Sequence, residues 1–174
     1  LMKTSADSLK KSADALNDSS LWEKKKIKKK DEKTGEEIEV EDYDWDKITK
    51  AVKSFVEDYN DVVKEAGESN TKDVLRNASW MTGMTDKNSN MLAQIGITIG
   101  KGNKLELDED ALKQADISSL KTVFTGYNSF VSKISQKATG ISNAANRASA
   151  TYTNNGTYSK TDSSLTSSKI DKEV

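Results

Sequence analysis

The sequence predicts a mainly α-helical fold, an elongated antiparallel helical bundle with two small β-hairpins at about residues 24–41 and 97–107. Apolar residues recur at alternating steps of three and four through several long segments, which is the spacing that lines one face of a helix. Two other segments carry strand-like runs on either side of a glycine-containing turn, which is typical of a hairpin.

The composition limits both the core and the chemistry. Hydrophobic residues make up 34% of the 174 positions, so we expect one domain with a thin core. The chain contains no His, no Cys and no Pro. Side chains that titrate near neutrality, thiolate nucleophiles and zinc sites built on Cys or His are therefore excluded. We expect no catalytic residues, no cofactor and no metal site, and hence a protein that is not an enzyme.

The charge balance bears on the partners. Lys and Arg number 27 and Asp and Glu number 28, for a net charge of −1, which does not favour a nucleic acid partner. No stretch approaches the roughly 18 consecutive apolar residues of a membrane span, so we expect none.

The first helix is predicted over about residues 3–17, where one face carries Met2, Ala6, Leu9, Ala13 and Leu16. The polar residues 17–20 favour its end, because such side chains compete for backbone hydrogen bonds.

Segment 23–43 is the most charged part of the chain. A lysine-rich run and a glutamate-rich run flank a turn that contains Gly35, which predicts a hairpin. A register with Ile27 opposite Ile38 would place opposite charges across the strands, with the pairs Lys26–Glu39 and Lys28–Glu37. Two interpretations stay open. The hairpin is either a projecting interaction arm that uses these four charged residues, or a solvated insertion with no function.

The second helix is the clearest, with Asp44 as N-cap and Gly67 as stop. Its apolar face carries Ile48, Val52, Phe55, Tyr59, Val62 and Ala66. A third helical segment opens at Asn70 or Thr71, and a fourth lies around residues 91–95. The pattern leaves open whether these are two helices or one bent rod.

The rest of the chain predicts the second hairpin, a short helix capped by Asp108, and one long helix over about 117–151. Half of the residues in 153–174 are Ser, Thr or Asn, too polar to bury a core. We therefore expect a single helical domain over 1–152, with the charged hairpin inserted at 23–43, followed by a flexible polar tail over 153–174.

Three further patterns favour structural roles. Gly100-Lys101-Gly102 leads into a strand and fits a hairpin turn better than a phosphate-binding loop. The acidic run that starts at Asp108 fits a helix cap better than a calcium loop. The three tryptophans, at positions 22, 45 and 80, are expected to pack rather than to stack on a ligand.

Four motifs in order carry a family resemblance. They lie in residues 51–60, 92–97, 104–112 and 123–126, and their defining residues are Phe55, Val56, Tyr59, Asn60, Ile95, Gly96, Ile97, Leu105, Leu107, Asp108, Phe124 and Gly126. Over about residues 48–160 the chain resembles the C-terminal conserved region of the bacterial flagellar filament capping protein family, hook-associated protein 2.

The resemblance implies a helical leg domain of an extracellular, flagellum-associated protein that assembles as a ring and helps flagellin subunits join the filament. Implied partners are flagellin or other axial flagellar subunits, and the full-length form is expected to self-associate. The alternative is a secreted or surface helical interaction and adhesion module that uses the charged hairpin as its binding tip.

Overall fold

The structure is a computed structural model that describes residues 1–160, with side chains described through residue 150. Its elements in chain order are α1 (Met2–Leu16), the 3-10 turn η1 (Ser19–Trp22), β1 (Lys25–Lys30), β2 (Glu37–Asp42), α2 (Trp45–Gly67), α3 (Lys72–Lys87), α4 (Ser89–Ala93), β3 (Ile97–Ile99), the 3-10 turn η2 (Lys101–Asn103), β4 (Leu105–Leu107), α5 (Glu109–Gln114), α6 (Ile117–Phe124) and α7 (Phe130–Lys160).

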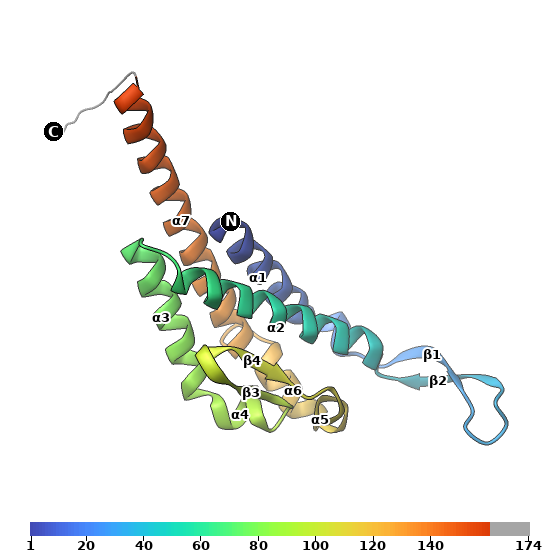
Figure 1. Ribbon diagram of the computed structural model, residues 1–174. Helices are drawn as coiled ribbons and strands as arrows, with labels where there is room; N and C mark the ends of the chain where they lie inside the picture. The colour runs from blue at the N-terminus through green and yellow to red at the C-terminus, as the bar shows by residue number, and fades with distance from the viewer. Residues whose placement is uncertain (161–174) are drawn as a thin grey trace.

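The fold is the predicted mainly α-helical bundle with two antiparallel two-stranded hairpins. Helix α1 lies along both α7 and α2, and α3 packs on α7 from another side (Figure 1). The β3–β4 hairpin and the short helices α4, α5 and α6 close one end of this body (Figure 1). The β1–β2 hairpin extends away from it.

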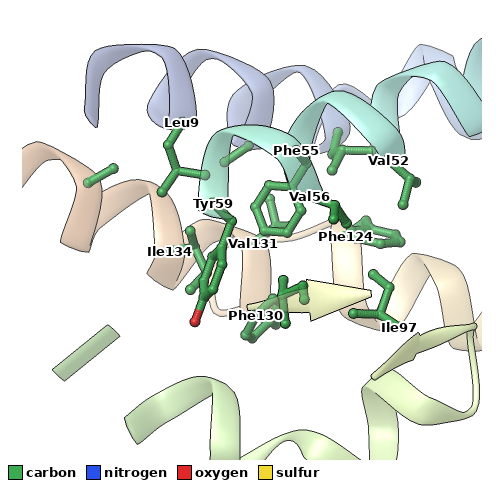
Figure 2. Close-up of a cluster of buried hydrophobic side chains, with 14 of the residues drawn as sticks. Leu9, Val52, Phe55, Val56, Tyr59, Ile97, Phe124, Phe130, Val131 and Ile134 are labelled. Carbon is green, nitrogen blue, oxygen red and sulfur yellow. The ribbon is translucent and has the colours of Figure 1, made fainter. Parts of the chain in front are cut away.

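The core forms where α2 and α7 bring aromatic and aliphatic side chains together (Figure 2). Phe55 is fully buried, with its ring 6.2 Å from the ring of Tyr59 and 6.3 Å from that of Phe130. Ile97 of β3 and Phe124 of α6 belong to the same cluster. The end of the body that contains the β3–β4 hairpin and the short helices therefore shares one hydrophobic core with the long helices.

Helix α2 has the predicted boundaries for local reasons. The Asp44 side chain accepts a hydrogen bond from the backbone N–H of Lys47, at 3.2 Å, and the helix ends at Gly67. Asp108 likewise caps α5 by accepting from the N–H of Ala111 at 3.1 Å. The question left open after residue 70 is settled in favour of two helices, because α3 and α4 are separated at Asn88.

The prediction of one long helix over about 117–151 is wrong. Helix α6 ends at Phe124 and α7 begins at Phe130, and between them Gly126 has φ +102, which no α-helix contains. Helix α7 also runs on to Lys160, into the segment expected as a polar tail. The remainder of that segment lies outside the described residues.

The predicted register of the first hairpin is wrong by two residues. Ile27 pairs with Val40, and Lys29 pairs with Ile38. Gly35 lies inside the turn, as predicted, with φ +74, and its N–H donates to the Asp31 carbonyl oxygen at 2.7 Å. Because a shift of two keeps every side chain on its face, the charge ladder survives with new partners, Lys26–Glu41, Lys28–Glu39 and Lys30–Glu37.

Candidate functional site

The β1–β2 hairpin is the feature that projects from the body (Figure 1). All six ladder residues are exposed, three lysines on β1 facing three glutamates on β2. The opposite face of the hairpin carries Ile27 and Val40, which are half-buried, and Ile38, which is 38% exposed. The arrangement offers exposed charges, which can align a partner of complementary charge, and a small apolar strip that a protein contact could cover.

Aromatic side chains fix the base of the hairpin on the β1 side. Trp22, just before β1, is buried and stacks on Phe124, with ring centroids 5.5 Å apart and planes 9° apart. Its Nε1 donates to the carbonyl oxygen of Leu16 at 2.7 Å. The hairpin therefore leaves the body from an anchored residue rather than from a loose linker.

The β2 side is held in the same way. Tyr43 and Trp45 are half-buried and meet edge to face at 6.1 Å, and the Lys24 ammonium lies 5.7 Å from the Tyr43 ring centroid. Lys29 pairs with Asp42 at 2.6 Å. The hydrogen bonds from Lys29 and from the Tyr43 N–H lower the pKa of the Asp42 carboxyl.

Packing was the expected role of the three tryptophans, and it holds for Trp22 and Trp45. It is wrong for Trp80, which is 53% exposed on α3 and lies under the Lys137 ammonium, 4.7 Å from the ring centroid. The helical spacing around Trp80 did not reveal this, because residues 78 and 81 occupy the buried face while residue 80 lies beside it.

Most of the family-motif residues lie inside the body, and several of them join distant elements. Asn60 on α2 forms two hydrogen bonds to the backbone of Leu105 in β4. Its Nδ2 donates to the carbonyl oxygen at 3.0 Å, and its Oδ1 accepts from the N–H at 2.7 Å. The Asn60 amide therefore satisfies the Leu105 N–H and C=O, as the backbone of a neighbouring strand would. Tyr59, one residue earlier, donates to Thr85 on α3 at 2.8 Å, and burial raises its pKa to about 12.

Gly96 and Asp108 form a tight crossing at the base of the second hairpin. Gly96 has φ +93, and a Cβ there would lie 2.7 Å from the Asp108 carbonyl oxygen. The Asp108 N–H donates to the Gly96 carbonyl oxygen at 2.8 Å. The remaining motif residues Val56, Ile95, Ile97, Leu105 and Phe124 are buried, and Leu107 is half-buried.

Gly126 is held by a residue that the sequence did not single out. The Asn17 side chain accepts from the Gly126 N–H at 2.9 Å and donates to its carbonyl oxygen at 3.2 Å. The break between α6 and α7 is thereby fixed to the end of α1. Asn17 was expected only to end the first helix, and no local pattern pointed to a partner 109 residues away.

Helix α1 carries a seven-residue repeat whose polar side chains form hydrogen bonds to α7. The pattern Lys-x-Ser-Ala-Asp-x-Leu occurs twice in succession, at residues 3–9 and 10–16. In each copy the aspartate accepts from the lysine four residues earlier and from a serine of α7, in the sets Lys3–Asp7–Ser142 and Lys10–Asp14–Ser135. The repeat itself is the sequence signal that could have revealed these contacts.

These contacts set the pKa of both aspartates. The hydrogen bonds from Lys3 and Ser142 lower the pKa of Asp7 below 3.8. Burial alone would raise the pKa of Asp14, but its lysine and serine partners outweigh burial and lower it.

The serines of the same repeat face α2. Ser5 donates to Glu65 at 2.5 Å, and Ser12 lies beside Asp58, whose pKa is raised mainly by burial. An open groove of about 320 Å³ lies between the two helices, lined by Ser8, Lys11, Ser12, Ala15, Ala51, Ser54 and Asp58. Small side chains on both helices leave this space.

Neither a metal-binding group of side chains nor a membrane-spanning helix occurs in the part of the chain that the structure describes. Among residues 1–150, no three Asp or Glu side chains gather into a group that could hold a metal ion. Across the helices described up to residue 160, none combines the length and the apolar character of a membrane span.

The comparisons with known proteins give one result. The family described as flagellar hook-associated protein 2 C-terminus matches residues 69–173. This range begins after the Tyr59 and Asn60 motif on α2 and extends past the described residues. No curated protein and no solved structure matches the chain.

Proposed function

The chain belongs to the family of the flagellar hook-associated protein 2 C-terminus, and from this premise we propose that it is a non-enzymatic assembly protein of the bacterial flagellum that works through protein–protein contacts. The matched range contains α3 to α7 and therefore most of the helical body. Its proposed place is outside the cell, at the flagellum, as the helical leg of a cap-related protein.

One observation carries the mode of action. A charged hairpin with no apolar core of its own is held out from the body by buried and half-buried aromatic residues at its base. Positioning a solvated hairpin in this way reduces the conformational entropy lost when it meets a partner. The family match favours flagellin or another axial subunit as a partner of the protein, and it favours an assembly role over the alternative of an adhesion module.

Binding to flagellin tests the proposed role. The full chain, immobilised, is expected to retain purified flagellin subunits, and an excess of free chain in solution should compete for them. The comparison variant is Phe55→Ala, which removes a fully buried ring and destabilises the body, so retention of flagellin that depends on the folded surface should weaken. If flagellin is not retained by the folded wild-type chain, the proposed function is wrong.

A further inference from the structure

The β1–β2 hairpin has two unpaired strand edges. Within residues 1–160 its sheet consists of these two strands alone. The Asp31 N–H donates to the Glu36 carbonyl oxygen at 2.7 Å, so this pair is hydrogen-bonded. Hydrogen-bonded and non-hydrogen-bonded pairs alternate along an antiparallel ladder.

The charged pairs of the ladder are therefore the non-hydrogen-bonded ones, Lys30–Glu37, Lys28–Glu39 and Lys26–Glu41. Their backbone N–H and C=O groups point outward, away from the partner strand. Each edge of the hairpin thus offers the backbone groups of three residues to a strand from another chain, which is the requirement for strand addition.

The two edges differ in charge. Strand β1 reads KKIKKK and strand β2 reads EIEVED. A two-fold contact between two β1 strands would set lysine beside lysine, and one between two β2 strands would set glutamate beside glutamate, which is destabilising. A contact of β2 with β1 of another copy sets glutamate beside lysine. Every row of the extended sheet would then alternate in sign.

We propose that neighbouring copies of this chain join through their hairpins, with β2 of one copy added antiparallel to β1 of the next. The inference rests on the proposed role of the hairpin as a protein contact, and it names the partner as a second copy. Since β1 and β2 are antiparallel within the hairpin, a second antiparallel pairing makes β1 of the next copy parallel to β1 of the first. All copies therefore point the same way, and the contact is head to tail.

The uncharged positions of the hairpin agree with this geometry. Ile27, Ile38 and Val40 share the face opposite the ladder, and Ile38 is exposed. With the same register at the new edge, Val40 of one copy would lie beside Ile27 of the next, which extends one apolar row across the two copies.

A charge-swapped hairpin tests the arrangement. The variant carries glutamate at the three ladder lysines and lysine at the three ladder glutamates: K26E, K28E, K30E, E37K, E39K and E41K. It keeps the net charge and the attraction across its own strands. The wild type and this variant are each expected to self-associate, whereas mixed contacts would set like charges side by side and should be about tenfold weaker or more.

Sedimentation velocity with one of the two proteins fluorescently labelled measures both kinds of contact, at concentrations up to about 1 mM. A two-fold contact would give the opposite result, because unlike hairpins would then prefer each other. Three results would each overturn the inference. The wild type and the variant could associate with each other as strongly as with themselves, they could associate with each other more strongly, or the wild type could stay monomeric over this range.

A second variant tests whether the hairpin carries the contact. E37K with E39K puts lysine at two of the three outward-facing ladder positions of β2, opposite the lysines of β1, so self-association should be lost while the far-UV circular dichroism of the body is unchanged. The matched control is Glu57→Lys with Asp61→Lys, which makes the same charge change at exposed positions of α2. Equal self-association of these two variants would refute the assignment to the hairpin.

The outcomes separate this inference from the proposed function. A chain that binds flagellin and does not self-associate overturns the head-to-tail contact alone. A chain that does neither overturns both. If the wild type is monomeric and E37K with E39K loses flagellin binding, the hairpin contacts flagellin instead of a second copy.

Discussion

Replacing Asn60 by alanine removes the link between α2 and the second hairpin. Both hydrogen bonds to Leu105 disappear, and Leu105 is buried, so its N–H and C=O lose their partners in a place that water reaches poorly. Each such bond contributes about 0.5–1.5 kcal/mol, for a gross cost of about 1–3 kcal/mol. Alanine is a better helix former than asparagine by about 0.6 kcal/mol, which offsets part of this. The expected net loss is about 1–2 kcal/mol.

Urea unfolding followed by far-UV circular dichroism measures this free energy of unfolding, and hydrogen exchange at the Leu105 amide reports the local effect. Asn60→Asp adds a second test. A carboxylate can still accept from the Leu105 N–H but faces its carbonyl oxygen with no proton to donate, so the loss should equal or exceed that of alanine.

The control is Asp61→Ala, at the exposed neighbouring position of the same helix, which should change stability by no more than about 0.5 kcal/mol. The reasoning is refuted if Asn60→Ala costs no more than this control and leaves the exchange of the Leu105 amide unchanged.

Three further predictions concern stability. Gly96→Ala should cost at least about 2 kcal/mol in a thermal or urea melt, because its Cβ would meet a backbone oxygen at 2.7 Å; Gly102→Ala, with φ +71 and open space, should cost clearly less, and equal losses would contradict the steric argument. Phe55→Ala should cost about 3–5 kcal/mol, and a change within experimental error would mean that its face is not buried. Asp7 and Asp14 have pKa values lowered below 3.8, so their contribution is present above that pH and lost as the pH falls; unfolding free energies between pH 7 and pH 2 should decline from about pH 5, and less steeply when both residues are replaced by asparagine.

Local sequence was sufficient to place α2 and α5 and to assign the charged face of the first hairpin. The N-caps Asp44 and Asp108 act within three residues of their partners, so reading the chain locally was sufficient to place α2 and α5. The alternation of charge in the first hairpin likewise placed lysines and glutamates on one shared face. Strand alternation has a period of two, so this assignment survived a register that was wrong by two residues.

The register itself depended on the conformation of the turn. Both registers pair an apolar residue with Ile27, and both place lysine opposite glutamate, so the side chains hardly distinguish them. Gly35 lies in the turn with a positive φ, as predicted, but the pair that closes the turn is Asp31 with Glu36, which sets every later partner two residues away from the predicted one. The backbone hydrogen bonds of the turn therefore decided the register.

The sequence by itself determined most of the helical segments, which faces are apolar, that the chemistry of catalysis by His or Cys is missing, and that the family motifs occur in order. Tertiary structure alone decided what those motifs do. Asn60 and Asn17 contact backbones 45 and 109 residues away, and the apolar stripe continues from α6 into α7 through Gly126 although the chain turns there. Hydrophobic periodicity shows which face of a helix or strand is buried. The partner of a polar side chain is decided only when segments distant in the sequence pack together.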